Sequence, residues 1–194
     1  MGKAEQTKQH IIEQAAPIFN EKGIAGTTVD DVLAAAKVAR GCLYSHFENK
    51  DDLSLQTVDY LLNKMTGHIR TLMAAESTSK GKIYAYLNAA KNPLSSYIDG
   101  GCPILNMAAE SDDNHPEVKE KVKEKVSSSQ KLFSSILSTG IKNGECKTSL
   151  NPSDFANKMF FAIEGAIVFC RILENNKAML ALINNLKAEL ESHE

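Results

Sequence analysis

A segment near the amino terminus, Thr27–Lys50, has the residue pattern of two short helices joined by a tight turn. Thr28 is suited to begin the first helix, because its hydroxyl can accept a hydrogen bond from an unpaired N–H of the first turn. Asp31, three residues later, can bond back toward this cap and interacts favourably with the helix dipole. Apolar residues then recur at helical spacing from Val29 to Ala36, which predicts one buried face.

The second predicted helix follows Val38. Leu43 and Phe47 lie one helical turn apart and can share a buried face. The remaining residues of this helix then point largely outward, and they are Arg40, Cys42, Tyr44, Ser45 and His46. Guanidinium, hydroxyl and imidazole groups can bond base edges and phosphate oxygens. This arrangement is typical of a helix-turn-helix, whose second helix enters the major groove.

A third helix is expected to follow, with Asn49 as its N-cap and Asp52 in its first turn. Lys50, at the start of this helix, can meet a DNA phosphate with help from the helix dipole. Gly41 keeps the backbone of the preceding helix free of a side chain where DNA would approach.

Residues Thr7 to Leu62 resemble the DNA-binding domain of the TetR/AcrR family of bacterial transcriptional regulators. The similar stretches are IIEQAAPIFNEKG and TTVDDVLAAAKVARGCLYSHFENKDDL, and the most specific run is Leu43-Tyr44-x-His46-Phe47-x-x-Lys50. The resemblance implies an all-α protein that binds double-stranded operator DNA. It divides the chain into a helix-turn-helix domain at residues 1–50 and a ligand-binding and dimerisation domain at residues 51–194.

At the family spacing, the outward residues are expected to contact DNA together. Arg40 and Ser45 are predicted to read bases, and Thr28, Tyr44, His46 and Lys50 to contact phosphates. Gly41 and Cys42 complete the predicted surface, although most similar sequences have Thr or Ser at position 42. Taken singly, each has a structural alternative: Thr28 only caps its helix, Tyr44 only packs its ring, and Lys50 is only solvated.

The charge of the chain limits how it can bind nucleic acid. The net charge is −2, and up to Lys50 there are six Lys and Arg against six Asp and Glu. DNA binding must therefore use a few placed cations rather than a strongly basic surface.

A cytoplasmic protein is predicted, because the first residues lack the apolar core of a signal peptide. The most apolar stretch, Met159–Leu173, is too short to span a membrane and carries two charges. The four cysteines are far apart, which indicates free thiols in a reducing compartment.

Helical periodicity continues through the rest of the chain, with no convincing strand pattern. A first helix is expected at about Glu5–Lys22, kinked at Pro17 and stopped by Gly23. The other helices are expected at about Lys50–Ala75, Lys82–Ile98 (with a bend or early end at Pro93), Ile104–Glu110, Pro116–Ile141, Pro152–Glu174 and Lys177–Glu191. These predictions give a three-helix head and a body of five or six helices.

The resemblance implies a homodimer held by the last two helices in a four-helix bundle. The predicted interface residues are Phe160, Gly165, Ala166, Phe169, Leu182 and Leu186. Twofold symmetry would place two recognition helices on the half-sites of a near-palindromic operator. The alternative is that Pro152–Glu174, which is apolar on more than one side, is a central core helix of a monomer.

The resemblance also implies a small-molecule effector that binds in the body and releases DNA. The predicted pocket residues are Met65, His68, Ile69, Cys102, Asn106, Phe133 and Phe161. For each of them, an ordinary place in the core or on the surface is the alternative. No cofactor and no metal site are predicted.

Two other classes of function are alternatives for this sequence. A redox or electrophile sensor on the same scaffold could use Cys102 or Cys42, provided that the thiol is exposed and its pKa is lowered. An enzyme is not predicted, because the five histidines are isolated and no catalytic motif occurs. The acidic cluster at Glu110, Asp112 and Asp113 is interpreted as solvated charge.

Overall fold

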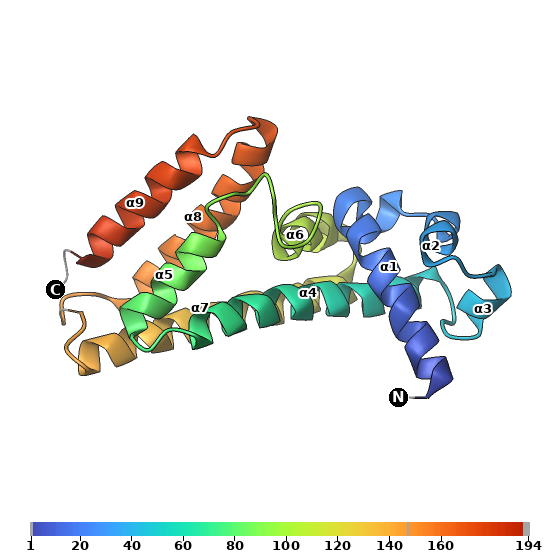
Figure 1. The fold of residues 1–194 in the computed structure, drawn as a ribbon, viewed down its shortest axis with the longest axis horizontal. Coiled ribbons are helices and arrows are strands. Elements are labelled where there is room, and N and C mark those ends of the chain that lie inside the picture. Colours follow the sequence, from blue (N-terminus) through green and yellow to red (C-terminus); the bar gives the residue numbers. More distant parts are fainter. Residues whose placement is uncertain (1, 147, 192–194) are drawn as a thin grey trace. The chain divides into compact units, whose positions relative to one another are not determined.

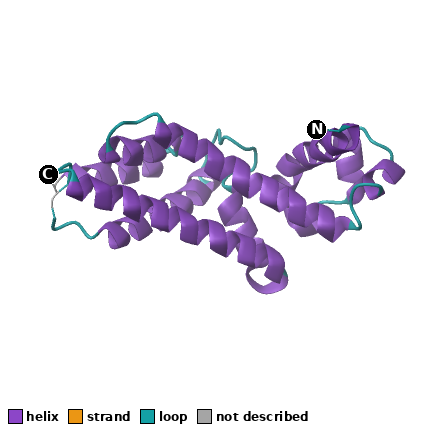
Figure 2. Cartoon of the chain, turned by 90° about the horizontal axis from the view of Figure 1, so that it is seen from below, coloured by secondary structure: helices purple, strands orange, loops and turns teal. Residues whose placement is uncertain are grey.

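The computed structural model describes residues 2–146 and 148–191, and over these residues the chain forms α-helices and no strand (Figures 1 and 2). The helices are α1 (Lys3–Gly26), α2 (Val29–Ala36), α3 (Arg40–Tyr44), α4 (Lys50–Ala74), α5 (Ser79–Ala89), α6 (Pro103–Asn114), α7 (Pro116–Lys142), α8 (Pro152–Ile172) and α9 (Lys177–Glu191). The prediction of an all-α fold is confirmed. None of the helices in the described ranges is both long and apolar enough to cross a membrane.

Several helices begin where the sequence predicts. The Oδ1 atom of Asn49 accepts a hydrogen bond from Asp52 N at 2.8 Å, immediately before α4. Before α8, the Oδ1 atom of Asn151 accepts from Ser153 N at 3.0 Å and from Asp154 N at 3.2 Å. These bonds occupy N–H groups that have no partner inside the helix, which is why the caps define the helix starts.

Other boundaries differ from the prediction. Helix α5 begins three residues early, because the Thr78 hydroxyl accepts from Gly81 N at 2.9 Å and caps it. It ends at Ala89, and Pro93 lies in the irregular segment that follows. Helix α6 continues to Asn114, beyond the predicted end at Glu110.

Within α1, the break in helical geometry is at Gly23 (φ 76°, ψ 175°). The kink predicted at Pro17 is not observed, because the backbone there keeps helical angles. Glycine adopts positive φ without a Cβ clash, so the chain can change direction at Gly23, between the main part of α1 and its last residues.

The chain divides into two compact units, and the first contains the residues up to Met65 together with Ile98–Lys123. In this unit α1 packs against both α2 and α6 (Figure 1). Its fully buried apolar residues include Ile11, Ala15, Phe19, Leu43, Leu53, Leu61 and Met107. The first three form the apolar row expected for the first helix.

The second unit contains Thr66–Tyr97 and the chain from Glu124 onward. Here α9 packs against α8 and α5 (Figure 1). The core includes Ile83, Leu87, Phe133, Leu137, Met159, Phe160, Ile163, Met179, Ile183 and Leu190. The ring of Phe133 lies between those of Tyr86 and Phe160, with centroid distances of 4.5 and 6.5 Å. The division at residue 50 stays a prediction about where the functional domains separate.

Candidate nucleic-acid interface

Helices α2 and α3 are joined by a three-residue turn. Lys37 adopts a left-handed conformation (φ 55°), and its N–H donates to Leu33 O to close α2. Helix α3 has five residues, and Leu43 O accepts bonds from the N–H groups of His46 and Phe47 just beyond it. Leu43 and Phe47 are buried, as their spacing predicts. The apolar side of the motif is therefore anchored in the core of the first unit.

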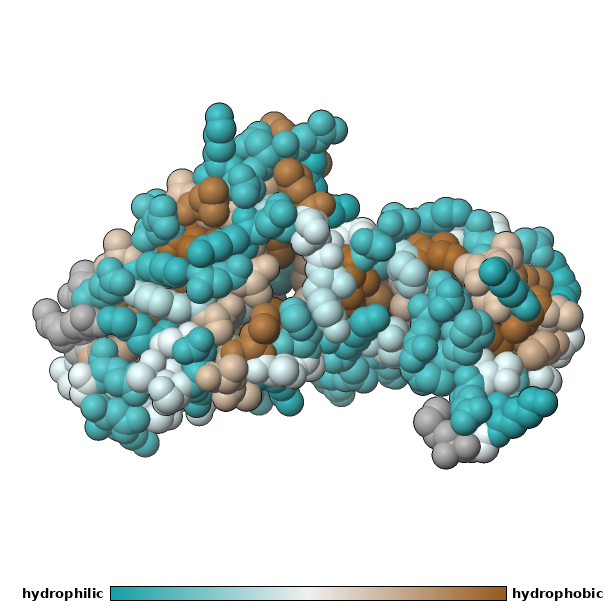
Figure 3. Space-filling model, in the orientation of Figure 1, coloured by the Kyte–Doolittle hydropathy of each residue, from teal (hydrophilic) through white to brown (hydrophobic). Residues whose placement is uncertain are grey.

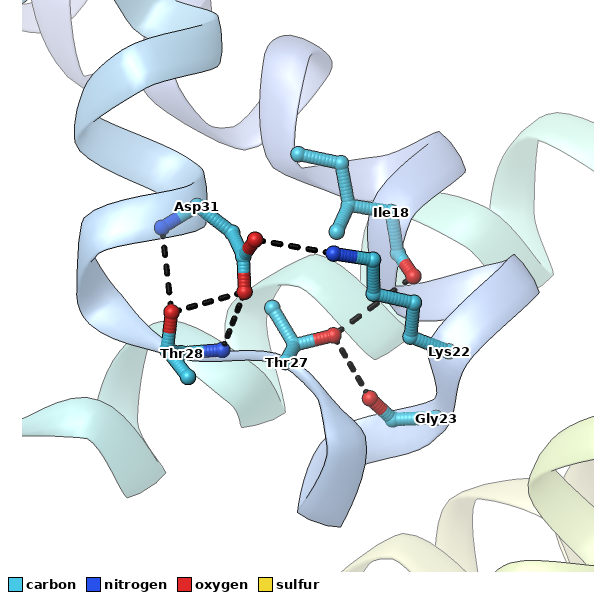
Figure 4. A network of polar contacts seen from close by, with 6 residues as sticks. All are labelled: Ile18, Lys22, Gly23, Thr27, Thr28 and Asp31. Atoms are coloured by element: carbon cyan, nitrogen blue, oxygen red, sulfur yellow. Dashed lines mark hydrogen bonds and ion pairs between the residues drawn. The ribbon is translucent and has the colours of Figure 1, made fainter.

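The start of α2 is tied to the end of α1 by a polar network (Figure 4). The Thr28 hydroxyl accepts from Asp31 N at 3.1 Å and donates to Asp31 Oδ2 at 2.7 Å, while Thr28 N donates to the same oxygen at 2.8 Å. Lys22 Nζ lies 2.8 Å from Asp31 Oδ1. Thr27 Oγ1 donates to Gly23 O at 2.6 Å. The predicted capping box is present, and it has a lysine partner that sequence reasoning did not include.

The Asp31 carboxylate has an unusually low proton affinity in this network. The hydrogen bond from Lys22, followed by those from Thr28, holds the pKa of Asp31 well below its ordinary value. Bonds donated to an ionised carboxylate favour its charged form. The cap therefore remains charged over the whole neutral and mildly acidic range.

The side chains predicted to face outward from the second helix are exposed or half-buried. Tyr44 is 45% exposed, and Arg40, Gly41 and Ser45 are also exposed. Cys42 and His46 are half-buried. No atom other than its own neighbours lies within 4 Å of the position a Cβ would take at Gly41. This face is therefore open for another molecule to approach closely.

Besides Thr28, three of the predicted DNA-contacting residues already have partners within the chain. Arg40 Nη2 lies 2.5 Å from Asp30 Oδ1. Ser45 Oγ donates to Cys42 O at 2.7 Å, and Lys50 Nζ donates to Ile24 O at 2.8 Å. An ammonium has three N–H donors, so Lys50 can hold the end of α1 and still bond a phosphate.

A buried amide network, which the sequence did not predict, supports α1 from the side of α6. Asn20 is 3% exposed, and its Nδ2 donates to Asp99 O at 2.6 Å and to Gly101 O at 3.1 Å. Asn106 Nδ2 donates to Asn20 O at 3.0 Å and to Asn20 Oδ1 at 3.1 Å. A polar residue within the apolar row of the first helix was the available signal, but it does not identify a partner some eighty residues away.

Glu110 is a second support, and its interpretation as solvated charge is wrong. Its Oε2 accepts from Ile24 N at 2.8 Å and its Oε1 accepts from Ala25 N at 2.7 Å, directly after the break at Gly23. These N–H groups have lost their helical partners at the break, and the carboxylate replaces them. The position of α1, against which α2 packs, is thus set partly by α6.

Comparison with known proteins agrees with this geometry. Residues 11–57 match the family profile described as "Bacterial regulatory proteins, tetR family", and residues 80–186 match "Tetracyclin repressor-like, C-terminal domain". The chain belongs to the TetR family. It is accordingly a DNA-binding transcriptional regulator and not an enzyme.

Individual relatives extend along nearly the whole chain. The HTH-type transcriptional repressor DhaR of Mycobacterium sp. (strain GP1) is 27% identical over 174 residues, which are 89% of this chain and 86% of DhaR. A TetR transcriptional regulator from Chloroflexus aurantiacus J-10-FL has a crystal structure with 30% identity and a TM-score of 0.93, covering 100% of this chain and 98% of the other. A cysteine mutant of CifR, solved with a 26-base-pair double-strand operator, shares the fold at 15% identity with a TM-score of 0.80, covering 93% of this chain and 94% of that one.

In this TetR-family chain, the predicted effector residues lie in different surroundings. Met65, Cys102 and Asn106 belong to the first unit, and His68, Ile69, Phe133 and Phe161 to the second. The Asn106 amide bonds Asn20, His68 stacks on Tyr97 at 3.7 Å between centroids, and Phe161 is exposed. The pocket stays a prediction.

The predicted dimer residues divide into buried and accessible ones. Phe160 and Leu186 are buried inside the second unit of this TetR-family chain. Phe169 is 66% exposed, Ala166 and Leu182 are half-buried, and a Cβ at Gly165 would meet no atom within 4 Å. Sequence periodicity showed that α8 is apolar on several sides but not which side the chain itself covers.

The thiols also differ in accessibility. All four cysteines are free, and Cys102, Cys146 and Cys170 are buried, whereas Cys42 is half-buried on α3. Burial raises the pKa of the Cys146 thiol and so lowers its thiolate fraction. These surroundings do not favour a redox sensor at the buried thiols.

Proposed function

We propose that this TetR-family regulator is a homodimeric repressor that a small-molecule ligand releases from a near-palindromic operator. The observation that carries the proposal is the open face of α3, with Arg40 and Tyr44 exposed and Leu43 and Phe47 buried behind them. A short helix that is held by its apolar side and presents hydrogen-bonding groups on the other can be inserted into a major groove.

Within this proposal, the polar residues have different roles. Arg40 and Ser45 read bases, and Tyr44, His46 and Lys50 contact phosphates together with Thr28. The Thr28 hydroxyl has one O–H donor, which it gives to Asp31 Oδ2, so its hydrogen bond to a phosphate oxygen would have to replace this bond to the carboxylate. Bidentate contact between Arg40 and a guanine is the expected source of sequence discrimination.

An exposed apolar face on α8 supports the homodimer. Phe161, Phe169 and Ile172 are 57%, 66% and 68% exposed and follow one another at steps of eight and three residues, with Gly165 between the first two. These positions share one side of a helix. Leu180 on α9 is also exposed, and apolar surface reaches solvent over the α8–α9 region in Figure 3. Burying a fully exposed side chain of this kind stabilises by about 1.5–3 kcal/mol, and these partly covered side chains would contribute less than that to a complex.

Ligand release is the second part of the proposal. A ligand that binds the body better when the two heads are misaligned with successive major grooves shifts the population of dimers away from DNA. DhaR is named as a repressor, which supports repression rather than activation by this chain.

The dimer is tested by replacing an exposed residue of α8. Phe169→Glu places a charge on the proposed interface, and light scattering coupled to gel filtration should change from a dimer to a monomer. Leu94→Glu is the matched control, because Leu94 is an exposed apolar residue of the loop after α5. A dimeric Phe169→Glu protein would show that the interface is elsewhere.

DNA recognition is tested by selecting duplexes from a random pool with the wild-type protein and measuring their affinities. Arg40→Ala should reduce discrimination between the selected duplex and a scrambled one by about 5- to 150-fold, which corresponds to about 1–3 kcal/mol. Arg70→Ala, at an exposed position in α4, should leave it unchanged. If no motif is enriched, the proposal fails.

A further inference from the structure

An ion pair joins the two helices of the DNA-binding motif on its solvent side. Asp30 lies in the first turn of α2, and Arg40 is the first residue of α3. Asp30 Oδ1 and Arg40 Nη2 are 2.5 Å apart, although the two side chains are 77% and 57% exposed. The residue pattern predicts a role in DNA binding for Arg40 and none for Asp30.

The pair has little to do with the stability of the fold. Ion pairs between exposed side chains in water contribute little to folding, because the charges are screened and the long side chains lose freedom. The cap of α2 does not need Asp30 either, since the neighbouring Asp31 supplies both bonds of the capping box and also binds Lys22. Asp31 therefore fixes the start of α2, and the contact between Asp30 and Arg40 is not needed for the cap.

The geometry of the contact leaves Arg40 able to bind DNA. A guanidinium has five N–H donors in a planar fork, and the contact with Asp30 uses Nη2. The other donors can still bond the O6 and N7 atoms of a guanine. A carboxylate beside the guanidinium repels phosphate oxygens and holds a flexible side chain in one region, which disfavours contact with the sequence-independent backbone.

We propose that Asp30 is a specificity-determining positioning residue that holds Arg40 for base readout and keeps it away from phosphates. The inference rests on the proposed function, in which Arg40 reads a base. Removing the carboxylate charge should release Arg40 to any nearby phosphate. The affinity for unrelated DNA then rises, and the affinity for the operator rises less or falls.

The test compares Asp30→Asn with wild type on two duplexes of equal length, one selected by the wild-type protein from random DNA and one scrambled. The ratio of the two affinities should fall about tenfold, within the range expected for one base contact. On the scrambled duplex, the slope of log affinity against log salt should steepen by about 0.9, the value for one additional phosphate contact. Asp30→Glu should restore most of the ratio.

Two controls separate positioning from other effects. Asp51→Asn removes an exposed carboxylate from the first turn of α4 and should lower the ratio much less than Asp30→Asn. In an Arg40→Ala background, Asp30→Asn should cause no further loss of discrimination. An equal effect in both backgrounds, or an equal effect of Asp51→Asn, would mean that general charge and not positioning is responsible.

The failures of the two proposals are distinguishable. If Arg40→Ala keeps full discrimination, the role of Arg40 in the proposed function is wrong and the inference about Asp30 falls with it. If Arg40→Ala loses discrimination while Asp30→Asn keeps the wild-type ratio and salt slope, DNA recognition through α3 stands and only the positioning role is wrong.

Discussion

Replacing Asn20 by Asp tests whether the buried amide network holds α6 against α1. The substitution keeps the shape of the side chain but removes the Nδ2 donor that bonds Asp99 O at 2.6 Å and Gly101 O at 3.1 Å. The bond to Gly101 O is buried and the bond to Asp99 O is part-buried, and a buried acceptor left without a donor costs about 1–3 kcal/mol. The expected loss of stability is therefore about 3 kcal/mol, which lowers the melting temperature by roughly 6–12 °C for a chain of this size.

The loss should depend on pH in a defined direction. Burial and two facing carbonyls raise the folded-state pKa of the introduced carboxyl above its unfolded value of about 3.9. Below about pH 4 the carboxyl is protonated in both states and can donate one hydrogen bond, so the loss is smallest there. The loss grows as the pH rises through the unfolded pKa and becomes constant above the folded one.

Thermal unfolding followed by circular dichroism at about pH 4 and about pH 8 measures both effects, and each variant is compared with wild type at the same pH. Asn175→Asp is the control, because Asn175 is exposed and loses only a 2.9 Å bond to Leu173 O. Exposed substitutions of this kind change stability by less than about 0.5 kcal/mol. Equal melting temperatures for the two variants, or a loss at Asn20 that does not change with pH, would refute the account of the network.

Three further predictions concern the same unit, and the last has a glycine of the second unit as its control. Thr28→Ala should lower the stability of the protein by about 1 kcal/mol through loss of the cap, measured by denaturant unfolding. Hydrogen bonds from Lys22 and Thr28 hold the folded-state pKa of Asp31 below its ordinary value of 3.8, so the stability that its carboxylate gives to the fold is present above that pH and is lost as the pH falls further. Asp31→Asn should therefore show a shallower decline in melting temperature at acidic pH than wild type. Gly100→Ala should lower the stability of the protein by more than the roughly 1–2 kcal/mol of strain that a left-handed residue costs. The reason is that φ is +94° and the new Cβ would also lie 2.8 Å from Asn20 O. Gly144→Ala, with φ +75° and open space around the Cβ position, should show the backbone strain alone in the same unfolding assay.

Much of the candidate DNA-binding site could be predicted because its determinants are close together in the sequence. The capping box joins residues 28 and 31, and the buried pair at 43 and 47 follows from one helical turn. The start of α8 at Asn151 and Pro152 has the same local origin. Each of these features depends on contacts within four residues, so the order of residue types carries enough information.

The partners of the polar residues could not be predicted in the same way. Lys22 and Arg40 each bind an aspartate nine or ten residues away, and Glu110 binds backbone N–H groups 85 and 86 residues away. A charged residue has the same appearance in a sequence whether it is solvated or bonded to a distant backbone. The interpretation of Glu110 as solvated was wrong for this reason.

The residue order by itself determined the helices, their caps and the outward face of α3, because these follow from local hydrogen bonding and from periodic burial. Only the tertiary structure decided that Asn20 and Glu110 join α1 to α6, and that Asp30 lies against Arg40. It also decided that Phe160 is covered by its own chain while Phe169 remains exposed. The physical reason is that hydrogen bonds and burial depend on distances in space, and folding brings together groups whose separation along the chain carries no local signal.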